Sequence, residues 1–288
     1  MDRLQVALNK ARAKREANMR GGQEAGPPQA QDPAQAPAQE PAPPGPAAGD
    51  RSGAWNIIAP LNINEKALVR NRLVSFAGGK EAGPFDMLRT KMLQQAKSHG
   101  WRRIAIVSPH SGCGKSTTAG NLAFSFSRQQ DLRTLVLDFD LRRKGLAELL
   151  AQRGQDSMGD VLERRVAFQS HALRLGDNIA FGLNFGPVTN PSEILQSQQA
   201  AEVLAGIEDT YKPDIMLFDT PPLMASDDSH GFLETMDCAL LLVAAEQTTM
   251  DEIDVAERQL AGLTNVMGIV LNKCRYTNGA HGYEYDYY

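Results

Sequence analysis

The chain has few cysteines and no long apolar run. Its three cysteines are odd in number and far apart, so they provide neither a disulfide framework nor a metal-ligand spacing. Its longest apolar stretch, Cys238 to Ala245, is far shorter than the roughly 20 residues of a membrane-spanning helix. The charged N-terminus is not followed by an apolar segment, so no signal peptide is expected. These absences favour a protein of the reducing cytoplasm.

The chain also lacks an excess of positive charge. Its formal net charge is −4, which provides no general basic field for attracting nucleic acid. We therefore expect no nucleic-acid partner. Any role at the inner face of the plasma membrane must depend on a partner protein or on the surface of this protein.

Composition divides the chain into four parts. Residues 1–20 are basic, with apolar residues at helical spacing, which predicts an amphipathic helix that docks on a partner or on anionic lipid, or that stays solvated and frayed. Residues 21–54 hold half of the 16 prolines and are expected to form a disordered tether. Residues 55–275 are the expected folded domain, in which 55–74 wraps the domain edge. Residues 276–288 form a tail expected to be mobile.

A loop of small residues lies between an apolar run, 104–107, and a segment of helical spacing, 117–128. Successive N–H groups at a helix N-terminus bind phosphate, and glycines let the backbone wrap it. Lys115 is expected to reach the β- and γ-phosphates of a nucleotide, and the Ser116 hydroxyl to bind Mg²⁺. The expected nucleotide contacts in this loop are Ser111, Gly112, Cys113, Gly114, Lys115, Ser116 and Thr117.

This loop departs from the G-x-x-x-x-G-K-[ST] motif at one position. Pro109 replaces the first glycine. The alternative interpretation is a glycine-rich turn that carries a surface lysine. A strand before the loop and a helix after it favour the phosphate loop.

Apolar runs alternate with helical patterns through the rest of the expected domain. The expected strands are 104–107, 134–138, 179–185, 215–219, 239–244 and 266–271, and the expected helices are 85–100, 117–128, 191–206 and 249–262. Buried strands alternating with helices predict an α/β fold with a doubly wound, mostly parallel sheet of the P-loop NTPase type, flanked by helices. Its ligand is expected at the carboxyl ends of the strands.

Aspartates follow two of these strands. Asp138 ends the strand 134–138 and Asp140 follows two residues later, and Asp219 ends the strand 215–219, ahead of two prolines. Two carboxylates beside a polyphosphate require a cation between them, and Mg²⁺ accepts few protein oxygens. The expected metal site is Ser116, Asp138 and Asp219, with the aspartates acting through water. The alternative is that Asp138 and Asp140 are capping or solvated residues.

These segments, in this order, resemble the bacterial tyrosine kinases (BY-kinases) of capsule and exopolysaccharide assembly. The resemblance runs from residue 85 to the C-terminus and is most specific at 135–142, with its Asp-x-Asp-x-Arg pattern after a strand. It implies an autokinase that uses ATP and Mg²⁺, phosphorylates its own tail, and regulates polysaccharide polymerisation and export. The expected phosphate acceptors are Tyr283, Tyr285, Tyr287 and Tyr288.

Further roles are expected at single residues. Either Asp138 or Asp140 accepts the proton of the attacking tyrosine, and the resemblance favours Asp138. Arg142 is expected to stabilise the γ-phosphate or to bridge subunits. Asn272, at the end of the last strand, is expected to contact adenine.

The resemblance also implies partners. These are a membrane-embedded regulator of polysaccharide chain length, which activates the kinase, and a protein-tyrosine phosphatase. The family's Glu-x-x-Arg-x-x-Arg motif for ring assembly is degraded, because its positions hold Gly83, Asp86 and Arg89. A ring is therefore not favoured, although transfer between subunits through another interface stays open.

Two other functions remain open. One is an ATPase switch like the plasmid-partition and septum-placement proteins, which carry a signature lysine where this chain has His110. The other is a scaffold that binds ATP with little turnover, which Pro109 does not exclude.

Overall fold

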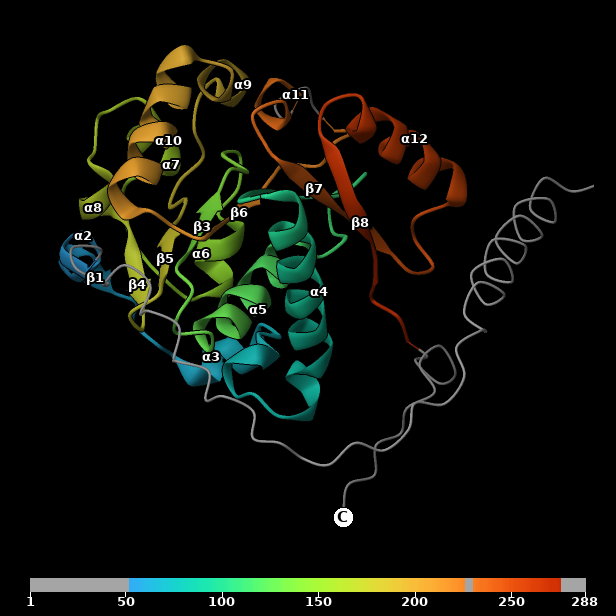
Figure 1. The fold of residues 1–288 in the computed structure, drawn as a ribbon, viewed down its shortest axis with the longest axis horizontal. Coiled ribbons are helices and arrows are strands. Elements are labelled where there is room, and N and C mark those ends of the chain that lie inside the picture. The colour runs from blue at the N-terminus through green and yellow to red at the C-terminus, as the bar shows by residue number, and fades with distance from the viewer. Residues whose placement is uncertain (1–51, 226–229, 276–288) are drawn as a thin grey trace, which may run out of the picture. The chain divides into compact units, whose positions relative to one another are not determined.

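The computed structural model describes residues 52–225 and 230–275 (Figure 1). The predicted N-terminal helix at 1–20, almost all of the predicted tether and the tyrosine tail at 276–288 lie outside these residues.

The described residues form one eight-stranded sheet, in the order β1-β4-β5-β3-β6-β2-β7-β8. The strands are β1 (Ala59–Pro60), β2 (Arg103–Val107), β3 (Thr134–Asp138), β4 (Leu173–Leu175), β5 (Ile179–Gly182), β6 (Ile215–Asp219), β7 (Cys238–Ala244) and β8 (Asn265–Asn272). Neighbouring strands are parallel except β4 and β5, which are antiparallel. The predicted doubly wound, mostly parallel sheet is confirmed.

Helices cover both faces of the sheet (Figure 1). One face packs against α3 (Glu65–Arg70), α4 (Gly83–His99), α5 (Lys115–Ser127) and α6 (Gly145–Leu149). The other packs against α2 (Ser52–Ile57), α7 (Met158–Leu162), α8 (Phe168–His171), α9 (Pro191–Leu195), α10 (Gln198–Tyr211), α11 (His230–Leu233) and α12 (Met250–Ala261). The short 3₁₀ turns η1 (Val74–Phe76) and η2 (Lys80–Ala82) lead into α4. Within the described ranges, no helix has both the length and the apolarity to cross a bilayer.

The central strands are continuous apolar runs because both of their faces are buried. Along β2, Ile104 and Ile106 enter the core beneath α4 and α5, whereas Ala105 and Val107 enter the core beneath α10 and α12. Because side chains alternate between two faces that are both covered by helices, only the ends of these strands lie within reach of solvent and ligands.

The predicted helix 191–206 is divided in the structure into two helices, α9 and α10, and the second continues to Tyr211. Ser197 between them adopts extended backbone, with φ −73° and ψ 145°. Its hydroxyl accepts a hydrogen bond from the Ala200 amide at 3.0 Å and so begins the second helix. The predicted strand 179–185 is also shorter, since β5 ends at Gly182.

The segment 55–74 follows the edge of the domain, as predicted. Trp55 is 1% exposed, and its indole nitrogen donates to the Tyr211 carbonyl at 2.8 Å. The short strand β1 then pairs with β4 at one edge of the sheet.

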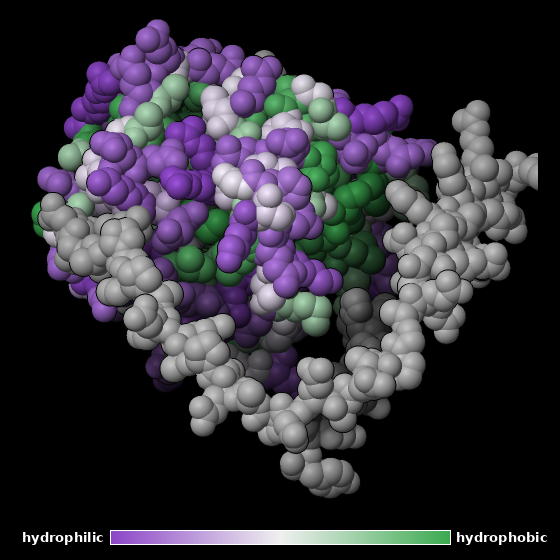
Figure 2. Space-filling model, viewed as in Figure 1, coloured by the Kyte–Doolittle hydropathy of each residue, from purple (hydrophilic) through white to green (hydrophobic). Residues whose placement is uncertain are grey.

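The other edge of the sheet, at β8, is less completely covered. Ile269 and Leu271 are 49% and 59% exposed. In Figure 2, apolar residues also gather over β7 and β8, while hydrophilic residues cover most of the rest of this view. The central strands are therefore better buried than the β8 edge, and the candidate site lies at the ends of these central strands.

Candidate active site

Three neighbouring strands, β3, β6 and β2, end at the candidate site. Asp138 and Asp219 are paired residues of β3 and β6, side by side at the ends of these strands. The loop that carries Lys115 follows β2, the other neighbour of β6. Residues that are distant in the sequence thus meet because parallel strands end at the same edge of the sheet.

The phosphate loop depends on glycine at two positions. Gly112 and Gly114 have φ of +80° and +99°, which side chains rarely tolerate. A Cβ atom on Gly114 would also lie 2.3 Å from the Asn272 side-chain nitrogen. The backbone then enters α5, whose first helical bond runs from the Thr118 amide to the Gly114 carbonyl at 2.9 Å.

Lys115 is buried at the base of this loop, with 6% exposure. Its ammonium donates to the Ser108 hydroxyl at 3.0 Å, and that hydroxyl donates to the His110 carbonyl at 2.6 Å. Burial lowers the pKa of Lys115, while the negative charges of Asp219 and Asp140 oppose this effect. Ser108, which sequence reasoning did not single out, therefore holds the lysine in the position from which it can reach a phosphate.

Asp138 and Asp219, hereafter the carboxylate pair, are fully buried and poorly partnered. Asp138 Oδ1 accepts a hydrogen bond from the Asp140 amide at 3.2 Å. Asp138 Oδ2 and both carboxylate oxygens of Asp219 have no hydrogen-bond partner from any described residue. Because a buried polar atom without a partner is costly, this arrangement indicates a ligand site.

The pKa values of the carboxylate pair reflect this environment. Burial raises the pKa of Asp138 well above its ordinary value, and the nearby charges of Asp219 and Asp140 raise it further. Burial also raises the pKa of Asp219 to about 6, although Lys115 and Ser116 act in the opposite direction. The Ser116 hydroxyl lies close enough to affect Asp219 without forming a hydrogen bond of good geometry.

The oxygens at this site fit Mg²⁺ held together with a nucleotide. Across the described residues, no group of three His, Cys, Asp or Glu side chains forms a metal site by itself. Mg²⁺ usually keeps several waters and takes one or two carboxylates plus substrate phosphates. The Ser116 hydroxyl and the unpartnered oxygens of Asp138 and Asp219 match that requirement.

Three other contacts hold the loop, and the sequence did not predict them. Arg143 donates from Nη1 to the Ser111 hydroxyl at 3.0 Å. The Asn272 amide donates to the Cys113 carbonyl at 2.8 Å. Cys113 is 3% exposed, Thr117 is half-buried, and Arg142 is exposed.

The third contact joins His110 Nε2 to Glu252 Oε1 at 2.8 Å. Glu252 also caps α12 by accepting from the Thr249 amide at 2.8 Å. The two residues are 142 positions apart, so no local pattern could reveal the pair. Only the Thr-x-x-Glu capping box around Glu252 is visible in the sequence.

The degraded ring motif lies in a second cluster of charges, between α4 and α5. Asp86 pairs with Arg128 and accepts from the Ser125 hydroxyl. Arg89 donates to the Ser125 carbonyl at 2.6 Å and to its hydroxyl at 3.0 Å. We call these four residues the α4–α5 charge cluster. The Arg89 side chain is 11% exposed, so this arginine serves the interior of its own chain.

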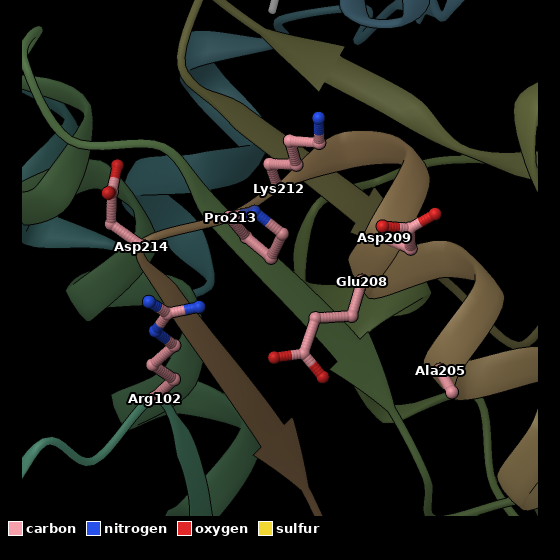
Figure 3. A pocket seen from close by; sticks show the side chains of 7 residues that line it. All are labelled: Arg102, Ala205, Glu208, Asp209, Lys212, Pro213 and Asp214. Carbon is pink, nitrogen blue, oxygen red and sulfur yellow. The ribbon is translucent and has the colours of Figure 1, made fainter. Parts of the chain in front are cut away.

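A separate cleft of about 370 Å³ opens near the amino ends of β2 and β6, at the opposite end of these strands from the phosphate loop (Figure 3). It is lined by Arg102, Ala205, Glu208, Asp209, Lys212, Pro213 and Asp214. These residues lie before β2 and β6 or at the end of α10, whereas the phosphate loop follows β2. Its lining mixes three carboxylates with the basic side chains of Arg102 and Lys212 and contains no glycine-rich loop, so the nucleotide site is assigned to the carboxyl ends of the strands.

Comparisons with known proteins agree with this geometry. The tyrosine-protein kinase YwqD of Bacillus subtilis (strain 168) is 27% identical over 206 residues, which cover 71% of this chain and 84% of that protein. The tyrosine-protein kinase wzc of Salmonella typhi is 30% identical over 188 residues, 64% of this chain and 26% of that protein. The chain thus spans about a quarter of the longer curated relatives that it matches.

A solved structure shares the fold. The kinase domain of the Escherichia coli tyrosine kinase ETK has a TM-score of 0.61 and 23% sequence identity, over 72% of this chain and 82% of that chain. The expected likeness to the bacterial tyrosine kinases is confirmed.

A family model described as the CobQ/CobB/MinD/ParA nucleotide binding domain matches residues 104–285. This match begins at β2, includes the phosphate loop and both strands of the carboxylate pair, and covers more than half of the chain. The chain therefore belongs to the CobQ/CobB/MinD/ParA nucleotide-binding domain family.

Proposed function

We propose that this protein is an ATP- and Mg²⁺-dependent protein-tyrosine autokinase of the bacterial type. The observation that carries the proposal is a buried lysine close to two buried carboxylates, three of whose four oxygens lack partners among the described residues. They meet beside a phosphate loop at the ends of adjacent parallel strands. The names of the relatives, tyrosine-protein kinases, support tyrosine as the acceptor.

Positioning and charge stabilisation supply most of the catalysis in phosphoryl transfer. We assign Lys115 and the loop amides from Ser111 to Thr117 to the phosphates of ATP. The Ser116 hydroxyl would bind Mg²⁺ directly, and Asp138 and Asp219 would hold it through water. Bound there, Mg²⁺ would neutralise the phosphate charge that these residues face.

Asp138 is the preferred base for the attacking tyrosine. It is fully buried, and its raised pKa makes it a better proton acceptor than an exposed aspartate. Asp140, 8% exposed, remains the alternative base. A tyrosine of pKa about 10 needs only modest help to attack a phosphate whose charge is neutralised.

The remaining assignments extend this proposal. Asn272 would contact adenine, and Arg142 would act on the γ-phosphate or across subunits. The acceptors would be Tyr283, Tyr285, Tyr287 and Tyr288, which lie outside the described residues.

The biological role follows from the same likeness. The kinase would regulate capsule or exopolysaccharide polymerisation and export from the cytoplasmic face of the plasma membrane. There it would meet a membrane-embedded chain-length regulator and a protein-tyrosine phosphatase. A ring built on α4 is disfavoured, because Arg89 already binds Ser125 of its own chain.

Incubation of the full chain with Mg²⁺ and ATP, followed by phosphopeptide mass spectrometry, tests the proposal. We expect phosphate on the tail tyrosines of the wild type and none on Lys115→Met. ATP hydrolysis without phosphotyrosine would instead indicate a partition-type switch. Nucleotide binding with neither hydrolysis nor phosphotyrosine would indicate a scaffold.

A further inference from the structure

A nucleoside triphosphate carries one more charged group than a diphosphate, so a site that distinguishes them needs a cation near the terminal phosphate. Lys115 supplies one cation at the buried base of the loop. In the described part of the chain, four further basic residues lie in the loop or shortly after the aspartates: His110, Arg142, Arg143 and Lys144.

His110 is already committed to another element. Its Nε2 lies 2.8 Å from Glu252 Oε1, and Glu252 is fixed at the N-terminus of α12 by its contacts with Thr249. The position that holds the signature lysine in partition ATPases is therefore tied, in this chain, to a carboxylate of the same molecule.

Arg143 is placed at the solvent-facing side of the loop. Its amide donates to the Asp140 carbonyl at 3.0 Å, which closes the turn directly after β3. Its guanidinium donates to the Ser111 hydroxyl at 3.0 Å. Arg143 and Ser111 are both exposed, whereas Lys115 is buried. The two cations therefore differ in exposure, with Lys115 at the buried base of the loop and Arg143 at its surface.

The turn that carries Arg143 also fixes which phosphate it faces. It follows Asp138, which together with Asp219 is assigned to the cation that would accompany the phosphates. The guanidinium also lies close to the ammonium of Lys115, which is assigned to the β- and γ-phosphates. Arg143 is accordingly on the γ-phosphate side.

We propose that Arg143 binds the terminal phosphate and makes the site selective for a nucleoside triphosphate over a diphosphate. This proposal rests on the function proposed above. The Ser111 hydroxyl holds the guanidinium beside the loop before a nucleotide arrives, and the planar fork of arginine can then bind phosphate with two parallel hydrogen bonds. Lysine cannot reproduce that geometry.

Calorimetric titration of the full chain with Mg²⁺·AMPPNP and with Mg²⁺·ADP tests this proposal. We expect Arg143→Gln to lose about tenfold or more in AMPPNP affinity, as for a lost charge-assisted hydrogen bond, with less than about a twofold change for ADP. Arg143→Lys should be intermediate. Lys144→Gln, which removes the same charge one residue later, is the control and should bind both nucleotides like the wild type.

Ser111→Ala tests whether Arg143 acts by binding the phosphate or by shaping the loop through its contact with Ser111. This variant keeps the cation but loses the hydroxyl that holds it, so it should keep most of the preference for AMPPNP. The proposal is overturned if Arg143→Gln weakens both nucleotides equally, if it weakens neither, or if Ser111→Ala loses the preference to the same extent. A wild type that binds neither nucleotide would instead refute the proposed function itself.

Discussion

The carboxylate pair and the α4–α5 charge cluster differ in whether the chain supplies partners for their carboxylates, although both lie in one domain. Asp86 is partly exposed and contacts Arg128, Arg89 and Ser125 of its own chain. Asp138 and Asp219 are fully buried, and most of their oxygens lack partners within the described residues. A charge that the chain neutralises is structural, whereas a buried charge that it leaves without partners awaits a ligand.

The same comparison also shows the role of the arginine that remains from the degraded Glu-x-x-Arg-x-x-Arg motif. In the α4–α5 charge cluster, the one arginine that survives from the motif is used between two helices of the same subunit. In this chain that arginine is part of the packing between α4 and α5. Changing the two clusters should therefore have opposite effects on stability and activity.

The largest effect is expected from Lys115→Met. Lys115 is the buried cation that faces the carboxylate pair. Its loss should lower the rate of autophosphorylation by about a hundred- to a thousandfold, as when other transition-state contacts are removed. Phosphotyrosine formation over time measures this, with Lys97→Met on the exposed face of α4 as the control. Equal rates in the two variants would contradict the assignment.

Asp138→Asn should abolish activity but stabilise the protein without ligand. The asparagine oxygen can still accept from the Asp140 amide, while an unpartnered buried charge is removed. We expect a gain on the order of 1 to 2 kcal/mol at neutral pH, seen as a melting temperature a few degrees higher.

The gain should depend on pH with a definite sign. The pKa of Asp138 is raised in the folded state above its ordinary value of 3.8, so the charged form costs stability at neutral pH. As the pH falls toward 3.8, the wild-type carboxyl becomes protonated in the folded state and the cost disappears. The difference in melting temperature between the two proteins should therefore shrink on acidification, and a constant difference would argue against this cause.

Asp86→Asn should have the opposite effect. It leaves Arg128 and the mostly buried Arg89 without their carboxylate. Because the cluster is partly exposed, we expect a loss of only about 1 to 2 kcal/mol, with nucleotide affinity unchanged below the melting transition. Chemical denaturation checks the loss. Nucleotide affinity that fell together with stability would place the cluster within the site.

The smallest effect on stability is expected from two glycines in helices. A Cβ atom on Gly145 would lie 2.8 Å from the Ser116 hydroxyl, whereas one on Gly206 would meet nothing within 4 Å. Gly206→Ala should therefore stabilise α10 by up to about 1 kcal/mol without changing activity. Gly145→Ala should displace the hydroxyl and lower Mg²⁺-dependent activity by roughly tenfold. Steady-state kinetics at varied Mg²⁺ would show whether the two variants differ.

The sequence was informative where a single element carries the signal. β3 and β6 have the predicted bounds, and α4 ends at Gly100 with φ +73° as expected of a helix-ending glycine. The carboxylate pair was predictable because each aspartate directly follows an apolar run. By contrast, β1 and β4 were not predicted, since they have two and three residues and no fully buried position.

Features that depend on two distant segments were not predictable. The His110–Glu252 pair requires α12 to lie beside the phosphate loop, and the contact of Arg143 with Ser111 requires the exact path of the turn after β3. The α4–α5 charge cluster likewise requires the packing of two helices. Each contact is set by tertiary structure, for which no local pattern exists.

The most direct test of the central claim is the melting temperature of three proteins with and without Mg²⁺·AMPPNP. The wild type and Asp86→Asn should both be stabilised by the ligand, with Asp86→Asn starting lower. Asp138→Asn should start higher than the wild type and gain little. If Asp138→Asn instead melts below the wild type without ligand, or gains as much from the ligand, the carboxylate pair is not the cation site proposed for this kinase.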